Sequence, residues 1–100
     1  SEDLERGIDL TYRLAPSGED ATTFVLHAGE WVIEGFQDHQ WPWLHVFTHS
    51  AFPSIRGEVA VIALEPHTGL PNSLNLPGSY SRVAAGETWA GEWGCKVRKP

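Results

Sequence analysis

Hydrophobic and polar residues alternate along most of this chain with the period of two that is typical of β-strands. Ile8, Leu10 and Tyr12, for example, alternate with Asp9 and Thr11. Turn-forming residues interrupt the pattern about every ten residues, which favours an all-β sandwich or barrel of antiparallel strands. The predicted strands cover residues 8–14, 22–27, 30–36, 43–48, 58–64, 80–84 and 89–97.

The segment 58–64 differs from the other predicted strands because it is apolar on both faces. Such a pattern predicts a central strand that is buried on both sides. Pro66 has no N–H to donate, so we expect the hydrogen-bond ladder to end there. Loops are expected at residues 37–40, at 50–57 and at 66–79, where three prolines and two glycines make the chain irregular.

Length and composition predict one β domain over residues 1–100 and limit its partners. The net charge is −6 and the basic cluster of Lys96, Arg98 and Lys99 is short, which argues against nucleic acid or membranes as partners. No signal peptide or membrane-spanning run is found, so we expect a cytoplasmic protein. The absence of Met suggests a processed product or a fragment. The single cysteine, Cys95, is expected to be a small buried hydrophobic residue.

Glu65 is the residue whose position suggests the most specific chemistry. It stands at the end of the apolar segment, directly before Pro66. A carboxylate held at the end of a rigid buried strand, partly shielded from water, is suited to act as a general base. A solvated glutamate at an ordinary strand end has the same sequence pattern, and spacing alone favours this second interpretation.

The five histidines do not form a recognisable metal motif. On a strand, His45 and His49 lie on the same side but about 13 Å apart, which is not metal-ligand spacing. The closely spaced histidines of a cupin-type site are missing, so neither a metal nor another cofactor is expected. His45 is instead expected to be half buried and to face a cleft.

Aromatic and amide side chains suggest a sugar-binding surface. The aromatic candidates are Trp31, Trp41, Trp43 and Phe47. They could form a stacking platform, although aromatic residues on strands more often belong to a core and its rim. Asn75 and its neighbours Asn72 and Ser73 carry amide and hydroxyl groups suited to sugar hydroxyls, and they are equally ordinary turn residues.

Three segments together resemble the C-terminal part of the aldose 1-epimerase (galactose mutarotase) family. They are Trp43-Leu44-His45-Val46-Phe47-Thr48, the run Val61 to Asn75 that contains Leu64-Glu65-Pro66, and the closing run Val83 to Gly94. The resemblance covers about residues 40–97 and is fairly specific when the segments are taken together. It implies an antiparallel galactose-mutarotase-like supersandwich, of which this chain forms about the last third.

The resemblance also implies a reaction on a sugar substrate. In that family the glutamate matching Glu65 removes the proton of the anomeric hydroxyl while a histidine protonates the ring oxygen. The ring opens, turns and closes as the other anomer. No histidine here stands in the family's His-x-Tyr-Trp/Phe-Asn-like motif, and the direction of His67 beyond Pro66 is not predictable. The acid is therefore expected from a partner chain or a missing N-terminal segment. Within this chain the expected sugar-binding residues are Trp43, His45, Phe47, His67 and Asn75.

Two functional hypotheses remain, and they belong to different classes. In the first, the chain carries the general base of an aldose 1-epimerase-type isomerase and is inactive in isolation. In the second, it is a non-catalytic β-sandwich that binds carbohydrate or packs against another subunit. If the chain is a fragment of a larger sandwich, its exposed edges predict that it oligomerises or aggregates in isolation unless its edge strands are covered.

Overall fold

The computed structural model describes residues 7–15 and 20–99, which form two antiparallel sheets of three strands each. One sheet has the order β1-β4-β5 and the other β2-β3-β6. The strands are β1 (Asp9–Arg13), β2 (Ala21–Ala28), β3 (Trp31–Asp38), β4 (Trp43–Ser54), β5 (Gly57–His67) and β6 (Trp93–Arg98), and a short 3₁₀ turn, η1 (Ser73–Asn75), follows β5. The predicted all-β, antiparallel architecture is confirmed.

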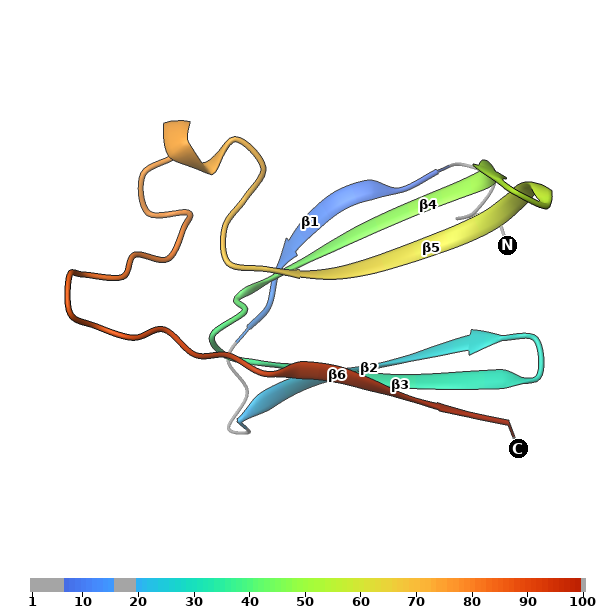
Figure 1. Ribbon diagram of the computed structural model, residues 1–100, viewed down its shortest axis with the longest axis horizontal. Helices are drawn as coiled ribbons and strands as arrows, with labels where there is room; N and C mark the ends of the chain where they lie inside the picture. The colour runs from blue at the N-terminus through green and yellow to red at the C-terminus, as the bar shows by residue number, and fades with distance from the viewer. Residues whose placement is uncertain (1–6, 16–19, 100) are drawn as a thin grey trace.

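The two sheets lie in two layers that meet at one end and diverge towards the other (Figure 1). They meet where β3 leads into β4, and they are farthest apart at the hairpin turns β2–β3 and β4–β5. A cleft of about 710 Å³ lies between them, lined by Val46, Ile62 and Leu64 from one sheet and by Leu26 and Ala28 from the other. The apolar faces of the two sheets therefore face each other across this open cleft.

The chain buries little of its surface. Its accessible area is 7531 Å², whereas a folded protein of 11.1 kDa is expected to expose about 5,700 Å². Its radius of gyration is 15.9 Å, compared with about 13 Å for a compact chain of this length. Val32, which is 6% exposed, is the one apolar side chain that counts as buried in the described part of the chain. The two sheets thus cover each other only in part.

Gln37 holds the junction at which the two sheets meet. Its side chain is 1% exposed, and its Nε2 donates hydrogen bonds of 2.9 Å to the main-chain oxygens of Trp41 and Trp43. The neighbouring Asp38 carboxylate accepts from the backbone N–H of Gln40 at 3.0 Å and of Glu92 at 2.7 Å. The end of β3, the start of β4 and the approach to β6 are therefore tied together at one place.

The predicted loop over residues 50–57 is wrong, because β4 continues through this region to Ser54. A β-bulge between His49 and Phe52 takes up the break in the alternating pattern. Pro53 is tolerated because β1 pairs with residues 43–47, and no other strand of the described residues 7–15 and 20–99 lies beside β4 at Pro53 on that side. The hairpin turn itself is tight, and the Ser54 hydroxyl donates to the Gly57 oxygen at 2.7 Å.

The prediction that segment 58–64 forms a central, fully buried strand is also wrong. β5 lies at the edge of its sheet, with β4 on one side, and Val59 and Ile62 are exposed. Its pairing with β4 continues through Pro66 to His67, so Pro66 does not end the ladder. An edge strand tolerates proline where the missing N–H is not needed by a neighbour.

The C-terminal part of the described chain also differs from the prediction. Residues 80–84 form no strand, and only an isolated bridge joins Gly69 to Tyr80. β6 begins at Trp93 rather than at residue 89. Cys95 is exposed, because it lies on this edge strand beside the open space between the sheets. No helix of the described residues is long and apolar enough to cross a membrane.

Replacing Gln37 by Leu tests the junction. The substitution removes two hydrogen bonds to main-chain oxygens in a buried position, so we expect the free energy of unfolding to fall by about 1–3 kcal/mol. Urea denaturation followed by far-UV circular dichroism measures this change. Gln40→Leu, in the same connection but at an exposed position, serves as the control and should change stability little. Equal effects of the two substitutions would contradict the role given to Gln37.

Candidate functional site

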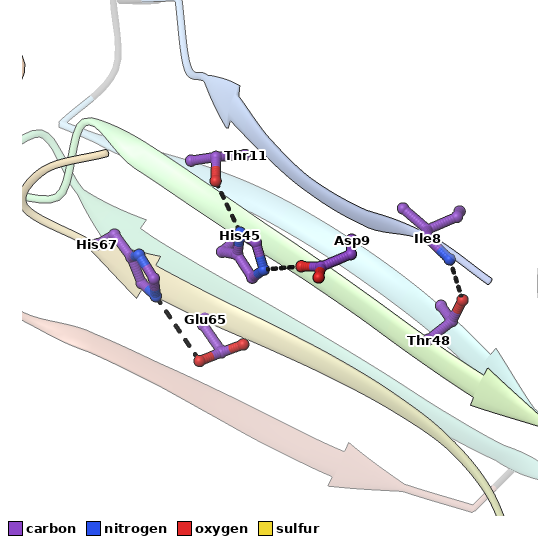
Figure 2. Close-up of polar contacts among 7 residues, drawn as sticks. All are labelled: Ile8, Asp9, Thr11, His45, Thr48, Glu65 and His67. Carbon is purple, nitrogen blue, oxygen red and sulfur yellow. Dashed lines mark hydrogen bonds and ion pairs between the residues drawn. The ribbon is translucent and has the colours of Figure 1, made fainter. Parts of the chain in front are cut away.

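Five polar residues from three strands gather on one face of the β1-β4-β5 sheet (Figure 2). Strand register brings them together, because Thr11 and Glu65 lie opposite His45 on its two sides. Opposed residues of antiparallel neighbours project from the same face of a sheet. We call this surface the histidine face and define it by Asp9, Thr11, His45, Glu65 and His67.

The histidine face is turned away from the second sheet. Val46, Thr48 and Leu64 alternate with the residues of the histidine face and line the cleft between the sheets. Because successive side chains of a strand point to opposite faces, the histidine face must lie on the outside. The candidate site is therefore an open surface that a second molecule can reach directly.

His45 is held from both sides of its ring. Its Nε2 lies 2.6 Å from Asp9 Oδ1 and its Nδ1 lies 2.7 Å from Thr11 Oγ1. In the neutral ring, Nε2–H donates to the carboxylate and Nδ1 accepts from the Thr11 hydroxyl. A hydroxyl can also accept, so protonated His45 keeps both contacts. With a side chain only 14% exposed, His45 is fixed in position and both of its nitrogens are occupied.

Glu65 and His67 lie side by side on β5. His67 Nε2 is 3.6 Å from Glu65 Oε1, within ion-pair range but longer than a hydrogen bond. The His67 ring stacks on that of His45, with centroids 5.4 Å apart and an interplanar angle of 13°. The Glu65 side chain is 48% exposed. The expected shielding of this carboxylate is therefore wrong, because β5 is an edge strand that water can reach.

Aromatic side chains flank the histidine face at both ends. At one end the Arg13 guanidinium lies 4.9 Å from the centre of the Trp43 ring. At the other end Phe47 and Phe52 pack edge to face with centroids 6.5 Å apart, next to His49. The histidine face and its flanking rings thus present carboxylate, imidazole and aromatic groups along one surface. This combination suits binding of a polar ligand that also has apolar patches.

Most of the predicted site residues lie on this one face of the sheet. Trp43, His45 and Phe47 project from alternate positions of β4, and Glu65 and His67 do so from β5. Asn75 belongs to η1 instead, and its Nδ2 donates to Asn72 Oδ1 at 2.6 Å within that turn.

The four-residue aromatic platform does not form as a unit. Trp41 packs edge to face against Trp89, with ring centroids 5.0 Å apart. Trp31 lies on the other sheet, where Lys99 Nζ is 5.8 Å from its ring centre. Only Trp43 and Phe47 belong to the candidate site.

The residues that the structure describes contain no group of three or more His, Cys, Asp or Glu side chains that could hold a metal ion. Neither a protein-family model, a curated protein nor a solved structure matches this chain. A functional assignment must therefore rest on the residues of the histidine face.

Asp9 and Thr11 are functional candidates that the sequence alone did not single out. The alternating pattern of β1 indicates that they share a polar face. It does not indicate that β1 pairs with β4, and only this pairing brings their side chains to His45. The sequence pattern does not show which strand pairs with β1, and in the structure the partner residue of Thr11, His45, lies 34 residues further along the chain.

Thr11→Val tests the fixation of His45. The substitution keeps the shape and the β-branch but removes the hydroxyl that contacts His45 Nδ1. We expect the free energy of unfolding to fall by about 1 kcal/mol, as for loss of one partly buried hydrogen bond. Chemical denaturation provides the measurement, and Thr23→Val, at an exposed strand position of the other sheet, provides the matched control. A Thr11 variant as stable as the control would show that the contact contributes nothing.

Proposed function

We propose that this chain forms the general-base portion of an aldose 1-epimerase-type isomerase that interconverts hexose anomers. The observation that carries the proposal is the register of β4 and β5, which sets Glu65 opposite His45 and beside His67 on an accessible surface. Two antiparallel sheets that cover each other only in part are compatible with a portion of a mutarotase-like supersandwich.

In the proposed reaction Glu65 acts as the base. Its carboxylate takes the proton of the anomeric hydroxyl, and the electron pair of that O–H bond forms the carbonyl as the bond between the anomeric carbon and the ring oxygen breaks. An acid delivers a proton to the ring oxygen. Rotation about the neighbouring carbon–carbon bond and reversal of these transfers give the other anomer, and both groups recover their original protonation states.

The proposed acid comes from outside this chain. Both nitrogens of His45 are engaged, by Asp9 and Thr11. His67 Nε2 is directed at the base itself, 3.6 Å from Glu65 Oε1, so a proton that it releases would pass to Glu65 rather than to the ring oxygen. A partner chain or an N-terminal segment lying over the histidine face supplies the acid in this proposal.

The sugar is proposed to lie along the histidine face between the flanking aromatic rings. Trp43 and Phe47 offer ring faces and edges to the apolar side of a sugar, while His45 and His67 line the path between them. Closure by the partner would also displace water from Glu65, which strengthens the electrostatic interactions of the carboxylate. Asn75 takes part only if its amide exchanges its bond to Asn72 for one to the sugar.

Glu65→Gln in the protein with its acid-supplying partner tests the proposed reaction. Glutamine keeps the shape of the side chain but cannot accept a proton, so the rate of anomer interconversion should fall by about 10²–10⁴-fold. Polarimetry on a freshly dissolved hexose anomer follows the reaction. Glu58→Gln, at the opposite end of β5, is the matched control and should retain activity. An unchanged rate in the Glu65 variant would refute the proposal.

A non-catalytic carbohydrate-binding module is the second candidate function. It is favoured by the open position of Glu65, whose side chain is about as exposed as that of the surface residue Glu34. It is also favoured by the engagement of both His45 nitrogens, which makes this ring a fixed part of a surface rather than a proton donor.

Tryptophan fluorescence separates binding from turnover. If the histidine face binds sugar, hexose titration should change the emission, and Trp43→Phe should abolish that change because Trp43 borders the site. Trp31→Phe, on the other sheet, should leave the change intact. A sugar-dependent signal with no anomer interconversion would favour the binding module, and a signal unaffected by Trp43→Phe would place sugar elsewhere.

A further inference from the structure

Between Glu58 and Glu65, the outer edge of β5 lacks the features that normally prevent edge strands from pairing, and its one proline, Pro66, lies near the end of the strand. β5 is the outer strand of its sheet, and the six residues between Glu58 and Glu65 are all apolar. Natural sheets protect their edges with lysines, prolines, bulges or short strands. The other three edge strands are shorter. β1 has five residues with a charge at each end, β6 has six residues of which two are basic, and β2 has eight, compared with eleven in β5. β5 is therefore the longest edge that could pair with another strand.

The chain as a whole, its open cleft included, exposes a surplus of surface similar in size to the area that a permanent dimer buries. The chain exposes 7531 Å², about 1,800 Å² more than a compact protein of its mass. Obligate homodimers bury roughly 1,000–2,500 Å² on each partner. Exposed apolar residues of β5, Val59 and Ile62 among them, contribute to this surplus.

The sequence of β5 is self-complementary in one antiparallel register. If Ile62 pairs with Ile62 of a second copy, all eleven residues from Gly57 to His67 find a partner. Small residues then face large ones, because Ala60 lies opposite Leu64 and Val61 opposite Ala63 of the other copy. Opposed residues of different size fill the space between strands without voids or clashes.

The same register also avoids electrostatic repulsion. It places Glu65 opposite Val59 and Glu58 opposite Pro66 of the second copy, so the two glutamates do not meet. A shift by one residue would turn the histidine face of the second copy to the other side of the sheet. In one direction this shift would also set Glu58 opposite Glu65, and directly opposed like charges are destabilising.

We propose that two copies of this chain pair antiparallel through β5, with Ile62 on the two-fold axis. The two β1-β4-β5 sheets join into one six-stranded sheet, with both histidine faces on one side and both clefts on the other. Identical antiparallel strands generate a closed two-fold interface, in which each contact occurs twice. This pairing does not depend on the sugar chemistry proposed for Glu65, and its tests do not measure activity.

Cysteine cross-linking reports the pairing and its register. All variants carry Cys95→Ser, because Cys95 is exposed. Opposed residues of an antiparallel pair have Cα atoms about 4.5–5.5 Å apart, within the range that a disulfide spans. Ile62→Cys should therefore form a covalent dimer on mild oxidation. Ile55→Cys, fully exposed at the β4–β5 turn, is the control and should remain largely monomeric on a non-reducing gel.

A second pair of variants checks the register on the outer face, where small changes do not disturb the cleft. A mixture of Val61→Cys and Ala63→Cys chains should cross-link. Neither variant should do so alone, because identical residues would then be diagonal neighbours, about 7–8 Å apart. Light scattering of the unmodified chain should give twice the chain mass of 11.1 kDa, and Ile62→Lys should reduce this to the monomer.

Several outcomes would overturn the proposal. A monodisperse monomer would exclude the dimer, and larger or polydisperse assemblies would exclude a closed two-fold contact. Cross-linking of Ile55→Cys as efficient as that of Ile62→Cys would indicate random collision. A dimer in which the Val61→Cys and Ala63→Cys mixture does not cross-link would place the interface elsewhere.

Discussion

The side-chain amide of Gln37 provides the constraint on which the arrangement of the sheets depends. A single buried nitrogen donates to two main-chain oxygens, one in the connection after β3 and one at the first residue of β4. Without Gln37, these two main-chain oxygens would lose a hydrogen-bond donor in a partly buried place, which lowers the stability of the fold. Because both bonds come from the end of β3, they set the point at which the chain leaves one sheet and enters the other (Figure 1).

The starting point of β4 determines the candidate site. β4 is the central strand of its sheet, and its register with β1 and β5 sets Thr11 and Glu65 on either side of His45. Side chains of a strand alternate between faces, so a slip by one residue would move His45 into the cleft and bring Val46 outside. The histidine face therefore follows from strand register rather than from any local motif. Its chemistry is that of a fixed imidazole beside an exposed carboxylate, in reach of a partner or a ligand.

The fold leaves much of its apolar surface exposed, and the proposed partners would cover part of the molecule. Apolar residues line the open cleft and the outer edge of β5, and Val32 is the only buried apolar side chain among the described residues. A domain of this size has little stability to spare. Covering either surface would add buried apolar area, which contributes about 25 cal/mol per Å². A second copy at β5 would therefore reduce this deficiency at the edge, whereas a partner over the histidine face would lie on the opposite side of the sheet from the cleft.

The alternating pattern by itself determined that the chain forms antiparallel strands and which residues of each strand share a face. This information is local, because two adjacent residues of a strand always point to opposite sides. It placed Trp43, His45 and Phe47 on one face of one strand, but it ended the next strand before Glu65, whereas β5 continues to His67. Only the tertiary structure decided that β5 is an edge, that β4 continues through a bulge beyond His49, and that Asp9 comes from β1 to His45. Those outcomes depend on which strands pair, and pairing is settled by contacts between residues far apart in the chain, which no local pattern records.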